Sequence, residues 1–414
     1  MANVLTPTDV YALVNSAVKA MSNANITQEV FDTSTFVSVG EAMLNVGYEN
    51  TLNALHTVFA NTIIDVRPYE GKFKIIAKTP ESYGYISRKI SFFSTELEKT
   101  SDWNTDLSSG LKDGETFDHY KIKKVYPLEI NFSGLKTKQF HYTTFRKQLK
   151  LAFSSEEEFS KYYVGEAVRI ATDLQKAEEA ENRLSVINAL GACYNKKLGI
   201  NLRTAFNNKF GTSYSSLELM TTYLKDFASF FVTMIKNDMD LFTDDTNDYH
   251  LTPVKTDDSG NNLVLYRHTP KANQRLIMYK PIWRDAESMV YPEIFHDDYL
   301  KPEQYEGVMF WQNRNKTDGT FDKMSMQIAV KPNQLNETTG ASETGAELAV
   351  GNNIYFLGFL FDDNALATTV RNEDIITTPV NAGYDGYNTY YHWGFNELFD
   401  MTENMRVYYL SDEA

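Results

Sequence analysis

The sequence predicts an α+β protein, with long helical patterns in its first half and short strand patterns toward its end. Two observations carry this prediction. The longest regular pattern runs from Ser154 to about Tyr194 with helical spacing, and the residues from Ile354 onward form aromatic strand segments. The 414 residues, of which 42% are apolar, are enough for one elaborate domain or for two to three subdomains with a large core.

Two helices are predicted near the N-terminal end. Thr6-Pro7-Thr8-Asp9 is a helix start signal, because proline is tolerated in the first turn. The apolar stripe that follows consists of Val10, Leu13, Val14, Val18 and Met21. A second helix is predicted from Val39 to Ala60, and short strands are predicted from Lys72 to Ala77 and from Tyr83 to Phe93.

A long two-stranded arm is predicted between Tyr83 and Phe132. The segment from Ser94 to Tyr120 is polar and contains the turn signal Asp113-Gly114, and strand alternation resumes from Lys121 to Phe132. We expect a mobile tip. Because an isolated hairpin is only marginally stable in water, the arm is expected to lie on a support, and a neighbouring subunit is the natural one.

The charge is arranged in blocks of opposite sign. Residues 91–120 carry a net charge of −5, residues 121–150 a net charge of +7, and residues 361–414 a net charge of −8. Such blocks either set the register between copies of a self-associating protein or form the solvated faces of a monomer. The predicted contact residues between subunits are Glu96, Glu98, Asp102, Asp106, Lys121, Lys123, Lys124, Lys136 and Lys138.

The helix from Ser154 to about Tyr194 is the longest predicted element. It begins with three glutamates and is expected to bury one apolar face. That face consists of Phe159, Tyr163, Ala167, Ile170, Leu174, Ala177, Leu184, Ile187, Leu190 and Tyr194. A rod of roughly 55 Å with a single apolar stripe is typical of a scaffold to which other layers attach.

One more helix and several strands complete the expected elements. The helix spans Ser216 to Asn237, and residues 331–351 are expected to form an exposed loop. The predicted strands are Leu263–Arg267, Arg275–Tyr279, Gly307–Gln312, Lys323–Val330, Ile354–Phe361, Tyr387–Phe395 and Met405–Leu410.

The sequence predicts no catalytic, cofactor-binding or metal-binding residues. The seven histidines show no pair at helical ligand spacing, and the acidic run Asp244–Asp248 lacks the calcium-loop pattern. Nucleophile-elbow, dinucleotide and phosphate-loop motifs are absent. The one cysteine, Cys193, excludes an intrachain disulfide framework and suits a reducing cytoplasm.

The bulk charge and hydropathy exclude two further classes. A formal charge of −15 argues against a protein whose main task is to grip nucleic acid, since phosphate binding needs clustered lysine and arginine. No membrane partner is expected, because the longest apolar run, Ile354–Phe361, is too short to span a bilayer and the N-terminus lacks a secretion-signal pattern.

Three short segments around the long helix carry a resemblance to a known family. They are Lys147–Phe153, with the sequence KQLKLAF, then Glu157-Glu158-Phe159, and then Glu178–Leu184. Together with the order of elements, they resemble the Hong Kong 97 capsid fold, and they look closest to major capsid proteins of short-tailed phages of the phi twenty-nine type. The likeness covers most of the chain in element order and about forty residues in sequence pattern.

The resemblance implies a division of the chain into five parts. Residues 1–66 would be an N-terminal helical arm, and residues 67–150 an extended hairpin loop with flanking strands. Residues 151–215 would form the peripheral domain with its spine helix, residues 216–351 mainly the axial domain, and residues 352–414 strands that return to the peripheral domain.

The resemblance also implies a function and its partners. The chain would be a major capsid protein of a tailed double-stranded DNA bacteriophage, assembled in the host cytoplasm into the icosahedral or prolate head of the virion. Copies would form hexamers and pentamers, with a portal and scaffolding or cement proteins as further partners. The packaged DNA would be held without sequence-specific binding, and no cofactor is implied.

Two alternatives stay open at the level of sequence. An encapsulin-like nanocompartment would share the fold and package cargo enzymes instead of DNA. A carbohydrate-active hydrolase would use carboxylates that leave no local signature, and it would require a cleft with a perturbed acid pair.

We expect that replacing Lys121, Lys123 and Lys124 together with glutamate prevents assembly and leaves the fold intact. The change reverses the basic block that is expected to face an acidic block of another copy. Electron microscopy of the purified variant checks assembly, and circular dichroism checks the fold. Closed particles of normal form would show that these lysines do not make the contact.

Overall fold

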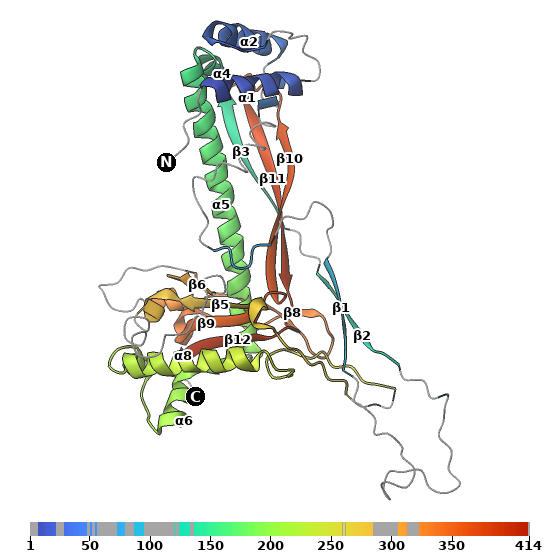
Figure 1. The fold of residues 1–414 in the computed structure, drawn as a ribbon, viewed down its shortest axis with the longest axis vertical. Helices are drawn as coiled ribbons and strands as arrows, with labels where there is room; N and C mark the ends of the chain where they lie inside the picture. The colour runs from blue at the N-terminus through green and yellow to red at the C-terminus, as the bar shows by residue number, and fades with distance from the viewer. Residues whose placement is uncertain are drawn as a thin grey trace, which may run out of the picture. The chain divides into compact units, whose positions relative to one another are not determined.

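The computed structural model forms two compact units, and each unit is assembled from three stretches of the chain (Figure 1). Unit 1 comprises Met1–Tyr85, Gly134–Leu184 and Thr368–Glu397, and unit 2 comprises the remaining residues. The structure describes residues 7–21, 29–47, 50–51, 54–55, 73–78, 87–94, 120, 124–132, 136–258, 260, 262–284, 305–312 and 323–412.

A three-stranded sheet covered on one face by α5 forms the body of unit 1. The strands lie in the order β10 (Leu366–Thr377), β11 (Gly386–Phe399) and β3 (Lys136–Phe145), and β11 runs antiparallel to β3. The helix α5 (Glu156–Asn195) has 40 residues, and its three glutamates favour the helix start through the macrodipole. Its Ile170 packs with buried aromatic residues of the sheet, which are Tyr142, Tyr391, Trp393 and Phe395.

Three short helices form a second core in unit 1. They are α1 (Pro7–Ala20), α2 (Thr33–Val46) and α4 (Arg146–Ala152). The fully buried ring of Phe36 on α2 packs within 6.0 Å of the Phe153 and Phe159 rings, measured between centroids. The predicted stripe of α1 is confirmed, since Val10, Leu13, Val14 and Met21 are buried and Val18 packs against them.

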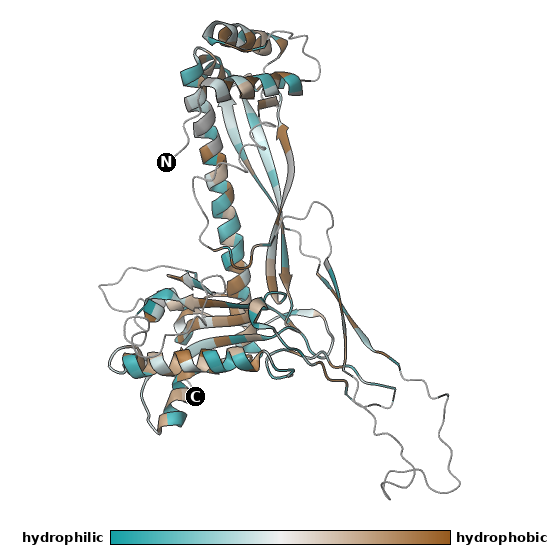
Figure 2. Ribbon diagram, viewed as in Figure 1, coloured by the Kyte–Doolittle hydropathy of each residue, from teal (hydrophilic) through white to brown (hydrophobic). Residues whose placement is uncertain are grey.

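A five-stranded sheet forms the core of unit 2. Its order is β4 (Gly199–Asn201), β12 (Met405–Ser411), β9 (Ile354–Asp362), β5 (Gln274–Tyr279) and β6 (Tyr305–Val308). β9 is antiparallel to both of its neighbours, and the outer pairs are parallel. Every residue of β9 is buried, which explains its continuous apolar sequence (Figure 2).

The helices α6 (Leu202–Phe210), α7 (Ser216–Met220) and α8 (Leu224–Leu241) complete this core. Asp238 of α8 ties the helix to β12 as well: its carboxylate accepts a hydrogen bond from the Tyr408 hydroxyl at 2.8 Å and pairs with Arg406 at 3.2 Å. Burial raises the pKa of Asp238, and the neighbouring Arg406 guanidinium opposes that rise.

Two small hairpins belong to unit 2. In the first, β1 (Ser87–Phe92) pairs antiparallel with β2 (Pro127–Phe132), so that Ser87 lies opposite Phe132. This pairing confirms the two strands of the predicted arm, whereas its expected tip lies outside the described residues. In the second, β7 (Asn333–Leu335) pairs with β8 (Ser342–Thr344) inside the segment predicted to be a loop.

Two predicted helices differ in the structure. The helix predicted from Val39 to Ala60 begins at Thr33, because the Asp32 carboxylate caps it by accepting from the Thr35 backbone N–H at 2.8 Å. It ends at Val46 instead of continuing to Ala60, because Gly47 leaves the helical conformation with a φ of 148°. The predicted helix Ser216–Asn237 is divided into α7 and α8 at the β-branched and aromatic residues Thr221-Thr222-Tyr223, which are weak helix formers.

The prediction was also wrong for one residue of the apolar stripe on α5. Leu184 is 45% exposed, because Asn182 points inward instead and donates to the Phe73 carbonyl oxygen at 2.8 Å. Residues two apart on a helix point in roughly opposite directions. Buried Phe159, Ile170, Ile187 and Leu190 confirm the rest of the stripe that can be judged.

Four predicted strands differ in the structure. The segment Leu263–Arg267 makes one isolated bridge, from Arg267 to Thr246, instead of a continuous strand pairing. Its apolar pattern reflects the burial of Leu265 in the core. The described part of Lys72–Ala77 is a turn with one bridge from Ala77 to Thr368. Lys323–Val330 begins as the 3-10 helix Lys323–Met326, and β6 ends at Val308 because the Trp311 indole turns inward to the Phe356 carbonyl.

Several elements were not predicted from the sequence. They are β3, β4, β10, α4, α6 and the short 3-10 helices Lys271–Asn273 and Val350–Asn352. β3 is exposed over its first four residues, and its burial alternates only from Phe140 to Phe145. One of the three inward positions there is Thr144, so the apolar pattern is weak, and the pairing with β11 identifies the strand.

We expect opposite stability effects from two glycine-to-alanine changes in unit 1. A Cβ on Gly40 of α2 would overlap the Phe153 ring, so Gly40→Ala lowers stability by about 1–3 kcal/mol. A Cβ on Gly165 of α5 meets open space, so Gly165→Ala raises stability by about 0.5–1 kcal/mol. Urea denaturation of both variants checks this, and equal shifts would contradict the packing of α2 on Phe153.

Candidate functional site

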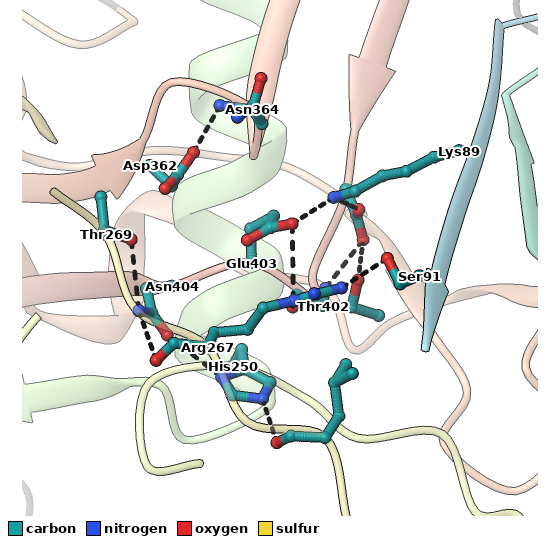
Figure 3. Close-up of polar contacts among 12 residues, drawn as sticks. Lys89, Ser91, His250, Arg267, Thr269, Asp362, Asn364, Thr402, Glu403 and Asn404 are labelled. Atoms are coloured by element: carbon teal, nitrogen blue, oxygen red, sulfur yellow. Dashed lines mark hydrogen bonds and ion pairs between the residues drawn. The ribbon is translucent and has the colours of Figure 1, made fainter. Parts of the chain in front are cut away.

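The turn between β11 and β12, Asp400–Asn404, is a buried polar junction (Figure 3). All five of its residues are buried, although none belongs to a continuous apolar run. The polar side chains and backbone groups of the turn bind segments that are far away in the sequence. We call this turn the junction turn.

Lys89 of β1 is the hairpin's charged contact with the junction turn. Its Nζ forms ion pairs with the carboxylates of Asp400 and Glu403. The other oxygen of Asp400 accepts from the Thr402 backbone N–H at 2.9 Å and from the Thr402 hydroxyl at 2.7 Å. Asp400 is therefore held in place by its own turn, with one oxygen left to face Lys89.

Arg267 is the second cation at the junction turn. It donates from Nη2 to the Ser91 hydroxyl at 2.7 Å and from Nε to the Thr402 carbonyl at 3.1 Å. Its Nε also lies 3.5 Å from a Glu403 carboxylate oxygen. Two cations thus face two carboxylates. Removing one partner of such a buried set costs about 3–5 kcal/mol, whereas exposed pairs contribute about 0.2–1 kcal/mol.

His250 closes the opposite side of the junction. Its Nδ1 lies 3.1 Å from the Asn404 side-chain oxygen, and its Nε2 lies 2.9 Å from the Leu265 carbonyl oxygen. The Asn404 amide donates in turn to the Thr269 hydroxyl at 3.2 Å. Burial lowers the pKa of His250, while the hydrogen bonds to Leu265 and Asn404 oppose that shift.

Backbone hydrogen bonds also join the junction to the end of β9 and to residues 249–251. The Asp362 N–H at the end of β9 donates to the Asn404 carbonyl at 2.9 Å, and the Leu251 N–H donates to the Met401 carbonyl at 2.8 Å. The Met405 N–H donates to the Tyr249 carbonyl at 2.7 Å. The junction turn therefore determines where β1, residues 249–269 and β9 meet.

The two faces of the hairpin differ in character. The inner face of β1 carries Lys89 and the buried Ser91, both bound at the junction. On the outer face, Ile90 is 51% exposed and Phe92 is 60% exposed, and the register places them opposite Glu129 and Pro127. We call these four residues, with Arg88 and Asn131, the outer face. Exposed apolar side chains of this size are typical of contact surfaces.

A second attachment holds the other end of the hairpin. The Lys255 ammonium donates to the Pro127 carbonyl at 2.8 Å, and the Asp258 N–H donates to the Tyr126 hydroxyl at 3.1 Å. Lys124 pairs with Asp258, but both side chains are exposed by 60% or more, so this pair is weak.

Three of the predicted contact residues can be placed, and each is paired inside the chain. Lys124 pairs with Asp258 in unit 2. In unit 1, Lys138 pairs with the buried Glu181, which Lys136 also approaches at 3.6 Å. The others, Glu96, Glu98, Asp102, Asp106, Lys121 and Lys123, lie outside the described residues. Their role between subunits stays a prediction.

Sequence reasoning did not find Lys89, Arg267, Asp400 or Glu403. One local signal was available: Asp400-Met401-Thr402 is an Asp-x-Thr turn pattern between two predicted strands. That pattern predicts a turn, but it does not identify the distant lysine and arginine that the turn binds.

Other chemistry finds little support in the described part of the chain. No cluster of three or more histidine, cysteine or acidic residues suited to a metal ion occurs there. Cys193 is completely buried, 3.9 Å from the Met405 sulfur, and burial raises the pKa of its thiol. Among the described helices, none has the length and apolar content to cross a bilayer.

Comparison with solved structures identifies the fold. A chain in the capsid structure of Staphylococcus phage Andhra superimposes with a TM-score of 0.50 over 84% of this chain and 86% of that chain, at 12% identity. A chain in the structure of the head fibre and inner core protein of native bacteriophage P68 gives a TM-score of 0.47 at 9% identity, covering 82% and 84%. The α+β fold of Hong Kong 97 type predicted from the sequence is thereby confirmed.

The comparisons by sequence find no relatives. No family model matches the chain, and no curated protein matches it either. The likeness is therefore one of fold.

We expect the stability of unit 2 to fall with pH below about 6.5, because the folded chain disfavours the proton that His250 accepts when unfolded. The contribution is present above pH 6.5 and is lost as pH falls toward the lowered pKa. The variant His250→Gln keeps a donor for Leu265 but replaces a buried ring, so its Tm at pH 7.5 is lower than that of the wild type. Because glutamine does not titrate, its Tm changes less than that of the wild type between pH 7.5 and 5.5.

The control for this prediction is His268→Gln, because His268 is exposed. Thermal unfolding at several pH values should show the wild-type pH dependence in His268→Gln. An unchanged pH dependence in His250→Gln would contradict the assignment of the proton to His250.

Proposed function

We propose that this chain is the major capsid protein of a tailed double-stranded DNA bacteriophage. The observation that carries the proposal is the fold likeness to the phage capsid chain, which extends over more than four fifths of both chains. A likeness over 84% of this chain and 86% of that chain does not depend on one common motif.

The hairpin supports a role in assembly. Its inner face is bound to its own chain through Lys89 and Ser91, and its outer face presents Ile90 and Phe92 to solvent. We assign the outer face to the contact with a second copy, because burial of apolar surface drives association while the polar inner face keeps the hairpin in position. Copies arranged as hexamers and pentamers would close a shell through many such contacts.

The charge of the chain fits a container for DNA. A net charge of −15 gives the wall little tendency to bind phosphate tightly, so packaged DNA would be enclosed without sequence-specific contacts. A portal and scaffolding or cement proteins would complete the head, and assembly would take place in the host cytoplasm before the protein becomes part of the virion.

Negative-stain electron microscopy of the purified protein after size-exclusion chromatography tests the proposal. Closed shells, tubes or rings of five or six copies are the expected result. Nucleic acid in native particles distinguishes a phage head from a cargo-filled nanocompartment of the same fold. A uniform 47.4 kDa monomer at several salt concentrations and with co-expressed phage proteins would count against the proposal and direct attention to a hydrolase.

We expect the double variant Ile90→Asp, Phe92→Asp to remain folded and to lose assembly. Both side chains are already exposed in the single chain, so the charges cost little there, but burial of two aspartates in a subunit contact is strongly unfavourable. Sedimentation velocity checks the particle content. The matched control Ile90→Val, Phe92→Leu keeps the face apolar and should assemble. Normal particles from the aspartate variant would exclude the outer face as a contact.

A further inference from the structure

We infer that Lys89 is a releasable latch: its ion pairs with Asp400 and Glu403 hold the β1–β2 hairpin on its own chain, and their loss frees the hairpin as an intact two-stranded element. The inference concerns the single subunit. It does not rest on the proposed function, since the latch is complete within one chain.

The hairpin has pairing contacts of its own that do not involve the junction. Six consecutive residue pairs join β1 to β2, from Ser87 with Phe132 to Phe92 with Pro127. The ion pair between Arg88 and Glu129, at 2.8 Å, also lies within the hairpin. Release from the junction therefore breaks none of the contacts that define the hairpin itself.

The receiving half of the latch is preformed. Asp400 accepts two hydrogen bonds from Thr402 through one carboxylate oxygen, so the other oxygen is directed at Lys89 whether or not the lysine is present. Arg267 also approaches Glu403: its Nε lies 3.5 Å from the carboxylate oxygen that Lys89 contacts. A fixed receptor and a single mobile cation are the two parts that a reversible latch requires.

Charge balance makes Lys89 decisive. With the lysine in place, Lys89 and Arg267 neutralise Asp400 and Glu403, whose side chains are 1% and 10% exposed. Without it, two nearly buried carboxylates share one arginine, so the junction carries an uncompensated negative charge. The side chain of Lys89 is 23% exposed, more than that of either carboxylate.

The other attachments of the hairpin are weaker than the ion pairs of Lys89. Arg267 to Ser91 and Lys255 to the Pro127 carbonyl are hydrogen bonds that water replaces on release. The pair of Lys124 with Asp258 is exposed and contributes little. Two further contacts lie just beyond the paired strands: the Asp258 N–H donates to the Tyr126 hydroxyl at 3.1 Å, and the Ser94 N–H, next to the buried Phe93, donates to the Val264 carbonyl at 3.0 Å. Along the paired strands themselves, the buried ionic contact of Lys89 is the strongest attachment.

A distance measurement between two spin labels tests the latch directly. Labels are attached to Asn131→Cys on β2 and Asn247→Cys on the body of unit 2, both exposed positions. The natural Cys193 is buried and its thiol pKa is raised, so it does not take up label. Double electron–electron resonance on the single-subunit fraction then reports the position of the hairpin.

The expected result is one narrow distance in the wild type and a broad distribution in Lys89→Met, with the ratio of docked to released hairpin lowered about tenfold or more. Glu403→Gln should shift the same way to a smaller extent. Lys89→Arg should restore the narrow distance. The matched control Arg88→Met removes the neighbouring exposed pair on the outer face and should leave the distance unchanged.

The outcome separates a latch from a merely stabilising ion pair. A Lys89→Met chain that keeps the wild-type narrow distance overturns the inference, whatever its Tm. If Lys89→Met fails to fold, the milder Glu403→Gln decides, and an unshifted distance in that variant overturns the inference equally. Because the measurement uses single subunits, failure of the shell proposal would leave its result unaffected.

Discussion

Charge balance at a buried turn determines where the hairpin meets the rest of unit 2. The junction turn Asp400–Asn404 places two carboxylates among side chains that exclude most water, and Lys89 and Arg267 must both be present to neutralise them. Because those cations come from distant segments, the requirement for neutrality brings the segments together. His250 and the end of β9 then bind the same turn through hydrogen bonds. Neutralising two carboxylates of one turn therefore fixes the positions of segments that are distant in the sequence.

The hairpin combines two kinds of interaction on opposite faces. Ion pairs and hydrogen bonds on the inner face depend on direction, so they orient the hairpin on its own chain. The outer face carries Ile90 and Phe92, whose burial is favourable against any complementary apolar surface. The strand period of two produces this separation, since neighbouring residues of β1 point to opposite faces. Substitutions on the inner face would change how the hairpin is held on its own chain, and substitutions on the outer face would change its contact with other surfaces.

The fold is similar to that of a phage capsid chain although only 12% of the residues are identical. Such a low identity is expected where the buried elements require apolar residues of suitable size and not particular ones. β9 is buried along its whole length and α8 buries Phe227, Phe231 and Ile235, so these elements require apolar residues of suitable size more than particular residues. Polar contacts such as the junction turn are more demanding, because each needs a partner of matching charge and geometry.

Elements with local signals can be predicted from the sequence. The stripe of α1, the length of α5 and the strands β5, β9, β11 and β12 follow from periodicity that is read within one segment, and the pairing of β1 with β2 follows from two such patterns and a turn signal between them. The start of α2 is set by the capping residues Asp32 and Thr35. They lie ahead of the apolar stripe, so periodicity alone places the start of the helix too late.

The remaining elements depend on contacts between distant segments. β3 alternates in burial only over its last six residues and is completed as a strand by its pairing with β11. Leu184 is exposed because Asn182 has partners inside. The candidate site shows the same limit most clearly: Lys89 and Asp400 are 311 positions apart, and no local pattern connects a lysine on one strand to a turn near the end of the chain. The physical reason is that opposite charges attract through space, while periodicity records only the neighbours along one helix or strand.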